Sequence, residues 1–264
     1  MIVYKSEAEI AAMRRSSRIV ARILAELAPL VAPGVTTRDL DAFAERRTRE
    51  LGAVPAFKGY RGYPASLCTS VNEEIVHGIP ADRVLREGDI ISLDYGVRAE
   101  GFYGDATVTL PVGAVNPAAS RLIAAARESF LAGVAAMKEG ARLSDISAAV
   151  QKRVEADGFS VIRAFVGHGI GRALHEEPQV PNFGLPGHGP KIRPGLVLAI
   201  EPMIAMGDWE VEILANGWTA VTKDRSLAAH YEHTVACTAS GTEILSAWDG
   251  ADAGSALDKE SLHA

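Results

Sequence analysis

The chain has 264 residues, of which 48% are hydrophobic and 23% charged, and its net charge is −6. This composition is typical of a globular protein with a large core, and the acidic balance gives no reason to expect a nucleic-acid or membrane-surface partner. Two cysteines imply no disulfide framework, the first residues are not a secretory signal and no stretch reaches the ~20 apolar residues of a membrane span, so we expect a cytoplasmic protein.

Four helices are predicted from apolar periodicity and capping signals. Ser6 opens the first helix with capping-box spacing, and this helix is expected to end near Pro33. The other three are expected over residues 37–51, 117–138 and 144–158, with glycines at or near their ends. Residues 248–264 are small and polar, and we expect a flexible tail.

The helical segments repeat at an offset of about 106 residues, from Gly34 to Gly140. A second match follows: in both halves a glycine leads into an apolar strand that delivers a carboxylate six residues later, Asp94 or Glu201. Two matches in the same order predict an α+β fold with a pseudo-twofold internal duplication. We expect its two sheets to face each other, with acids from both halves at the centre. The expected organisation is a single catalytic domain over 1–247, made of pseudo-repeats at about 6–112 and 117–245.

Asp94 and Asp105 lie on two successive predicted strands, 89–97 and 102–112. A hairpin that turns about Ala99 and Glu100 places Asp94 directly opposite Asp105, with Cβ atoms roughly 5 Å apart. Two facing carboxylates repel each other unless a cation lies between them. The alternative is a pair of exposed hairpin acids. Apolar neighbours favour a buried sheet, in which the carboxylates need a partner.

Three further residues fit the same chemistry. Glu201 interrupts the predicted apolar strand 196–204, and Glu232 lies in a similar stretch; the alternative for each is a buried glutamate paired with an arginine. His168 has glycine on both sides, which lets other groups approach the imidazole, although such a histidine is often a loop residue. The four negative charges of the carboxylates balance two divalent cations, and the neutral imidazole is the fifth ligand. Such a ligand set suits manganese, iron, cobalt or zinc. Such a pair of metals forms a hydrolytic site.

Other catalytic motifs are not evident. The sequence has no G-x-S-x-G elbow, and neither a Walker phosphate loop nor a dinucleotide-binding G-x-G-x-x-G follows a predicted strand. Cys68 as a nucleophile is an alternative, but we favour a small buried residue at this position. The metal-dependent hydrolase therefore stays the leading interpretation.

With these residues assembled, the chain resembles the bacterial type I methionine aminopeptidases from Lys5 to about Leu245. The short interval between Glu201 and Glu232 has no room for the large insertion that is typical of type II relatives. The pita-bread fold of this family is itself a pseudo-twofold duplication. The matching stretches are YRGYP (60–64), SVNEEIVHGIP (70–80), GFYGD (101–105), GHGIGRALHEEP (167–178), IEPM (200–203) and TKDRSLAAHYEHT (222–234).

The resemblance implies a metallo-exopeptidase that removes the N-terminal methionine from nascent proteins and peptides, with a preference for a small second residue. A hydroxide held by two divalent metal ions would attack the methionine carbonyl, and Glu201 would handle its proton. One metal would be held by Asp94, Asp105 and Glu232, and the other by Asp105, His168, Glu201 and Glu232.

Two histidines receive roles from the same resemblance. His175 would hydrogen-bond the developing oxyanion, and His77 would contact the scissile amide and assist the departing amine. The alternative for both is a loop histidine with a structural bond. The implied methionine pocket is lined by Tyr60, Tyr63, Cys68 and Trp218, and two departures from the usual bacterial pattern, Phe57 and Leu174, are expected to exchange volume across it.

The implied partners are the N-termini of nascent polypeptides, and ribosome contact is a hypothesis that no residue demonstrates. We expect no direct nucleic-acid or membrane partner, and a monomer. Two alternatives remain open. Prolidases and X-Pro aminopeptidases share the fold and metal site but usually carry an extra domain first, whereas the first helix here is expected to begin at Ser6. Binding proteins that lost catalysis typically lose metal ligands, whereas all five are present here with His77 and His175.

Overall fold

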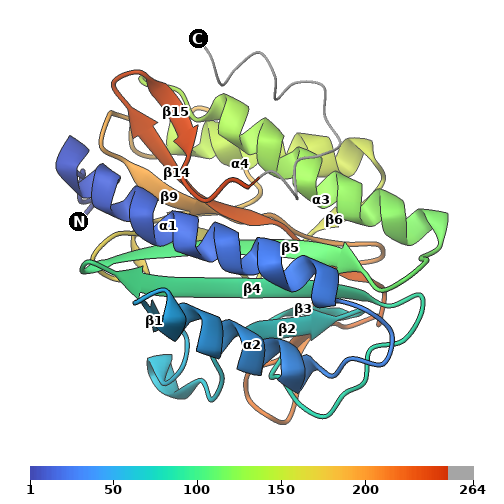
Figure 1. The fold of residues 1–264 in the computed structure, drawn as a ribbon. Helices are drawn as coiled ribbons and strands as arrows, with labels where there is room; N and C mark the ends of the chain where they lie inside the picture. Colours follow the sequence, from blue (N-terminus) through green and yellow to red (C-terminus); the bar gives the residue numbers. More distant parts are fainter. Residues whose placement is uncertain (249–264) are drawn as a thin grey trace.

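The computed structural model describes residues 1–248, in which two similar halves each begin with a pair of helices (Figure 1). None of the helices in this part of the chain is both long enough and apolar enough to cross a membrane. Trp248 is half-buried, and its ring contacts that of His233 with centroids 5.6 Å apart. The rest of the predicted flexible tail, 249–264, lies outside the described residues.

The four predicted helices are present. They are α1 (Glu7–Leu27), α2 (Thr37–Glu50), α3 (Pro117–Ala136) and α4 (Leu143–Ala156). The predicted capping box is confirmed, because the Ser6 hydroxyl accepts from the Glu9 N–H and the Glu9 carboxylate accepts from the Ser6 N–H. Helix α1 ends earlier than expected and continues only as the 3-10 turn η1 (Ala28–Leu30), because Pro29 has no N–H to donate.

Most strands of both halves join in one sheet. Among the described residues it has nine strands, in the order β1-β4-β5-β14-β9-β7-β8, with β2 also paired to β4 and β15 to β14. These strands are β1 (Val54–Pro55), β2 (Cys68–Val71), β4 (Ile90–Ala99), β5 (Phe102–Pro111), β7 (Gly167–Gly169), β8 (Glu176–Val180), β9 (Val197–Ile200), β14 (Glu232–Thr238) and β15 (Gly241–Ile244).

Pairing of β5 with β14 connects the first half to the second, so the halves share one sheet instead of forming two facing sheets as expected. Two smaller sheets complete the described fold, in the orders β13-β10-β6 and β11-β12-β3. Their strands are β3 (Glu74–Val76), β6 (Ser160–Val161), β10 (Met203–Ala205), β11 (Val211–Ile213), β12 (Ala220–Thr222) and β13 (Ala228–His230).

The hairpin of β4 and β5 turns one residue later than expected. Its turn residues, Glu100 and Gly101, both have positive φ (51° and 82°), as in the two-residue turns that match strand twist. In the resulting register Asp94 pairs with Thr107, and Asp105 lies two residues nearer the turn. The prediction that Asp94 lies directly opposite Asp105 is therefore wrong. Because the shift is two residues, both carboxylates still lie on the same face of the sheet.

Residues 196–204 form two strands instead of the single predicted strand. Strand β9 belongs to the nine-stranded sheet, whereas β10 belongs to a three-stranded sheet. Pro202, between the two strands, has no N–H and cannot continue the hydrogen-bond ladder. Glu201 is therefore at the end of a strand, where the chain leaves the large sheet.

The predicted internal repeat is visible in the backbone pairing. The N–H of Gly34 donates to the carbonyl of Leu85 at 2.9 Å, and the N–H of Gly140 donates to the carbonyl of Ile192 at the same distance. The isolated bridges follow the same correspondence, with Thr36 opposite Val84 and Arg142 opposite Lys191. The α+β class with internal duplication is confirmed.

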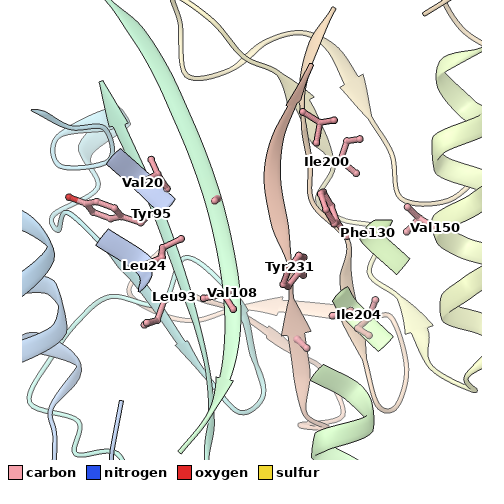
Figure 2. Packing of buried hydrophobic residues seen from close by; sticks show 14 of the residues in the cluster. Val20, Leu24, Leu93, Tyr95, Val108, Phe130, Val150, Ile200, Ile204 and Tyr231 are labelled. Carbon is pink, nitrogen blue, oxygen red and sulfur yellow. The ribbon is translucent and has the colours of Figure 1, made fainter. Parts of the chain in front are cut away.

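The main core lies between the helices and the large sheet. Figure 2 shows Val20 and Leu24 of α1 beside Tyr95 of β4 at the left of the view. At the right, Phe130 of α3 lies near Ile200 of β9. All five residues are fully buried or nearly so. Packing of both helix pairs on one sheet holds the central strands β5, β14 and β9 in place, and these strands carry the candidate site.

Candidate metal centre

Three carboxylates lie in a row where the two halves join. Thr107 of β5 pairs with Asp94 of β4 on one side and with Glu232 of β14 on the other. The Thr107 hydroxyl donates to the Glu232 carboxylate at 2.8 Å. Asp105 is two residues from Thr107 along β5, and side chains two apart share a face. The register therefore gathers Asp94, Asp105 and Glu232 on one face of the sheet.

Glu201 joins this group from the neighbouring strand β9. Ile200, the last residue of β9, pairs with His233 of β14. If this register continues by one residue, Glu201 lies level with Glu232. The Asn182 side chain donates to the Glu201 carbonyl at 2.9 Å and holds the backbone where it leaves the sheet.

His168 is held beside Glu201 by strand β7. Its Nδ1 donates to the carbonyl of Gly169 at 2.8 Å, which leaves Nε2 without a proton and directed toward the carboxylates. The distance from Nε2 to Oε1 of Glu201 is 3.5 Å. Burial lowers the pKa of His168 to about 4, so the imidazole is neutral near pH 7 and its lone pair is free for a metal.

Ionisation of the four carboxyl groups is unfavourable in this buried cluster. Burial raises the pKa of Asp94 to about 7. Burial and then neighbouring carboxylates raise the pKa values of Asp105, Glu201 and Glu232 well above the ordinary range. Four negative charges in such a buried cluster require positive charge nearby.

The residues fit a divalent cation. Within residues 1–248, Oδ1 of Asp94 and Oδ1 of Asp105 are buried without a hydrogen-bond partner. Asp105, His168 and Glu232 each offer a ligand atom, and these atoms lie within 4.8 Å of one another. Carboxylate oxygens with one imidazole suit manganese, iron, cobalt or zinc.

A cavity of about 150 Å³ opens on the carboxylates. Every residue that the sequence indicated for the site lines this cavity: Phe57, Tyr60, Tyr63, Cys68, His77, Asp94, Asp105, His168, Leu174, His175, Glu201, Trp218 and Glu232. Their roles remain predictions, but the fold brings all of them together.

His175 and His77 approach the cavity from two loops. The His175 ring lies 4.2 Å from that of His168, and its Nδ1 is 2.9 Å from the Tyr60 hydroxyl. Partial burial of the imidazole, followed by His168 and Arg61, lowers the pKa of His175 to about 3, and burial also lowers the pKa of His77. The His77 ring makes an edge contact with the ring of Trp218, with centroids 6.3 Å apart. Both imidazoles are therefore neutral near pH 7.

Part of the cavity lining is aromatic and apolar. The rings of Tyr63 and Trp218 make an edge contact at 5.2 Å, and the Tyr63 hydroxyl donates to the Gly78 carbonyl at 2.9 Å. Cys68 is buried, and burial raises the pKa of its thiol well above the ordinary value. A protonated thiol is a poor nucleophile, which supports the interpretation of Cys68 as a buried lining residue.

Sequence reasoning missed two residues at this site. Arg61 also lines the cavity, and its guanidinium lies over the Tyr60 ring, 5.4 Å from the centroid. His230 is buried, and its Nε2 lies 3.7 Å from Oε2 of Glu201 and 3.9 Å from Oε2 of Glu232. A signal for His230 was present, because it precedes Glu232 by two residues in an extended stretch.

Comparison with known proteins identifies relatives along nearly the whole chain. Residues 11–239 match the sequence profile of metallopeptidase family M24. A methionine aminopeptidase of Clostridium acetobutylicum is 51% identical over 246 residues, which cover 93% of this chain and 98% of the relative.

Solved structures agree with this relationship. The crystal structure of a methionine aminopeptidase from Thermotoga maritima matches with a TM-score of 0.92 and 46% identity, over 94% of this chain and 100% of that one. A prolidase from Pyrococcus horikoshii matches with a TM-score of 0.76 at 21% identity, and the match covers 64% of that longer chain; this likeness shows the fold alone. The chain has the pita-bread fold and belongs to metallopeptidase family M24, among the bacterial type I methionine aminopeptidases.

Proposed function

We propose that this protein removes the N-terminal methionine from nascent proteins and peptides that have a small second residue, with two divalent metal ions at its centre. One observation carries the proposal: a single cavity is lined both by the carboxylate and imidazole cluster and by aromatic and sulfur-containing side chains. Hydrolytic groups thus adjoin a surface that suits a thioether side chain.

The proposed ligand sets overlap at the centre of the cluster. Asp94, Asp105 and Glu232 hold one ion, and Asp105, His168, Glu201 and Glu232 hold the other. The row across β4, β5 and β14 supports this division, because Asp105 and Glu232 stand between Asp94 on one side and Glu201 on the other. When bound, the ions supply Lewis-acid activation of water and of the scissile carbonyl.

Glu201 is the proposed proton acceptor for the attacking water. Its carboxylate is at the end of β9 and borders the cavity. Without metal, burial and then the neighbouring carboxylates raise the pKa of Glu201 well above its ordinary value, and bound cations would offset this and leave the carboxylate ionised to accept a proton.

His175 is the proposed donor to the developing oxyanion. Because its imidazole is neutral, only one ring nitrogen carries a proton. Nδ1 lies 2.9 Å from the Tyr60 hydroxyl. In the proposed tautomer this hydroxyl donates to Nδ1, and the ring proton is on Nε2, which faces the substrate carbonyl. His77, which lines the same cavity, is proposed to contact the scissile amide and assist the departing amine.

The methionine side chain is proposed to bind among Tyr60, Tyr63, Cys68 and Trp218. Phe57 and Leu174 line the same cavity and complete its apolar surface. An aromatic box with a thiol favours a soft, unbranched thioether over the branched leucine side chain.

The proposed working unit is a monomer in the cytoplasm. All the proposed ligands and pocket residues belong to one chain. Both cysteines are unpaired, which fits a reducing compartment. Nascent chains are the proposed source of substrate, and contact with the ribosome stays a hypothesis.

Peptide selectivity tests the proposal. Met-Ala-Ser, Leu-Ala-Ser, Met-Leu-Ser and Leu-Pro peptides are incubated with protein that has been treated with a chelator and then reloaded with manganese or cobalt. We expect rapid cleavage of Met-Ala-Ser alone, and none before the metal is restored. Equal rates on the Met-Ala-Ser and Leu-Ala-Ser peptides would exclude methionine specificity. Preference for Leu-Pro would indicate prolidase activity, and inactivity with every metal would indicate a binding protein.

A further inference from the structure

His230 is a buried imidazole at the metal centre that is not among the five expected ligands. It is the last residue of β13 and pairs with Met203 of β10. Thr109 fixes its backbone on both sides: the His230 N–H donates to the Thr109 hydroxyl at 2.9 Å, and that hydroxyl donates to the His230 carbonyl at 2.8 Å. The fold therefore holds this imidazole in a defined place.

The imidazole is directed between two carboxylates. Its Nε2 has no hydrogen-bond partner within residues 1–248 and lies 3.7 Å from Oε2 of Glu201 and 3.9 Å from Oε2 of Glu232. His168 approaches the other oxygen of Glu201, Oε1, at 3.5 Å. The Glu201 carboxylate thus has one imidazole near each of its two oxygens.

These separations fit ligands that share a cation. Two ligand atoms ~2.1 Å from one metal lie about 3.4–4.0 Å apart when they subtend roughly 110–140° at it. A direct hydrogen bond from Nε2 to either carboxylate would need a separation of at most about 3.2 Å. Ligand atoms of Glu201, His230 and Glu232 all lie within 4.8 Å of one another, as do those of Asp105, His168 and Glu232.

We propose that His230 is a sixth metal ligand, which binds a divalent cation through Nε2 together with Glu201 and Glu232. His230 is buried, and its Nε2, which has no hydrogen-bond partner among residues 1–248, is placed to offer a lone pair to that cation. A neutral imidazole does not offset the charge of two carboxylates, whereas a divalent cation at this point does. Two oxygens and one nitrogen select cobalt, manganese or zinc over magnesium.

The number of imidazole ligands can be counted in the cobalt-loaded, full-length protein. In proton NMR spectra, each histidine bound through Nε2 gives a strongly shifted Nδ1–H signal that disappears in D₂O. We expect two such signals in the wild type. His230→Gln should lose one of them, and His168→Gln should lose the other.

His233 provides a matched control. It is also buried and adjoins Glu232, but its Nδ1 is 2.9 Å from the Ser246 hydroxyl and its Nε2 is 3.2 Å from the Tyr231 hydroxyl. His233→Gln should therefore keep both shifted signals. Calorimetric titration should show weaker Co²⁺ binding in His230→Gln by about 10–100-fold, the scale seen when a group that supports a metal site is removed.

A single exchangeable signal in the wild type that also persists in His230→Gln would overturn the proposal. The wild-type spectrum counts the imidazoles without any variant, so the test stands even if a substitution prevents folding. Because no peptide is cleaved in this experiment, its failure is distinct from failure of the proposed methionine removal.

Discussion

The side chains at the centre carry polar atoms that the protein alone leaves unpaired. Oδ1 of Asp94, Oδ1 of Asp105 and Nε2 of His230 are buried without a hydrogen-bond partner in the described part of the chain. Each such atom costs about 1–3 kcal/mol of folding free energy when nothing satisfies it. Hydrogen bonds hold the backbone around these atoms. For example, the Thr234 hydroxyl accepts from the Asp105 N–H and donates to the Asp105 carbonyl. The backbone is thus held firmly while the ligand atoms stay available.

Replacement of His175 tests its proposed contact with the oxyanion. His175→Ala should lower kcat by about 10²–10³-fold, the loss seen when one oxyanion donor is removed. Thermal stability should change little, because the side-chain hydrogen bond of His175 joins it to Tyr60 near the surface. Steady-state kinetics on Met-Ala-Ser, with metal content measured in parallel, checks the prediction.

Tyr60→Phe is the control for this substitution. It removes the hydroxyl that lies 2.9 Å from Nδ1 but keeps the imidazole and the stacked ring, whose centroid lies 5.3 Å from that of His175. We expect a smaller loss than in His175→Ala. Unchanged kcat in His175→Ala, at full metal content, would contradict the assigned role.

At the scale of elements, the N-terminal segment is tied to the loop that carries His175. Nζ of Lys5 donates to the Glu176 carboxylate at 2.7 Å, and their side chains are 3% and 14% exposed. The other Glu176 oxygen accepts from the Ala173 N–H at 3.1 Å. Gly171 permits this packing, because a Cβ there would lie 2.5 Å from Cε of Lys5. The ion pair therefore fixes the residue next to His175.

Removal of this buried pair should be costly. Lys5→Met leaves the Glu176 carboxylate buried without its cation, and we expect the free energy of unfolding to fall by about 3–5 kcal/mol. The double variant Lys5→Met with Glu176→Gln should recover part of the loss, because it removes the uncompensated charge. Urea unfolding followed by circular dichroism measures both changes.

The exposed pair of Arg15 and Glu100 is the matched control. Their side chains are 52% and 55% exposed, so water screens the attraction. Arg15→Met should therefore destabilise the protein far less than Lys5→Met. Similar losses in the two variants would contradict a structural role for burial of the Lys5 pair.

For the whole molecule, the metal centre lies on the junction between the two halves. Asp94 and Asp105 come from the first half, and Glu201 and Glu232 from the second. Bringing these carboxylates together is unfavourable by itself, as their raised pKa values show. Bound cations attract the four carboxylates and make their close approach favourable. We therefore expect the metal to stabilise the entire fold.

Metal removal should lower the melting temperature. An ion present at 100 times its dissociation constant stabilises the folded state by about 2.7 kcal/mol. Chelation should remove this stabilisation, and added manganese or cobalt should restore it. Differential scanning calorimetry of the chelated and reloaded protein checks the change.

Asp105→Asn separates charge repulsion from metal binding. In the chelated state this variant should melt above the chelated wild type, because it has one carboxylate fewer in the buried cluster. Added metal should raise its melting temperature far less than that of the wild type. A variant that melts below the wild type in both states would show that Asp105 serves the fold in another way.

Local patterns predicted much of this molecule. Capping and periodicity indicated the four helices, because these signals depend on residues within a few turns of one another. The acids stood out because ionisable side chains are rare in apolar strands. The hairpin register was wrong by two residues because the positive φ of Glu100, a residue that seldom adopts it, moved the turn.

What the sequence alone determined is the set of helices and the internal repeat, and with the family resemblance it indicated the five expected ligands and their neighbours in the cavity. Only the tertiary structure decided that the halves share one sheet, that Pro202 places Glu201 at a strand end, and that His230 faces the carboxylates. These features depend on pairing between strands far apart in the chain, such as β5 with β14 and β10 with β13. Neighbouring residues encode whether a strand forms, but its partner and register are set by packing of the whole molecule.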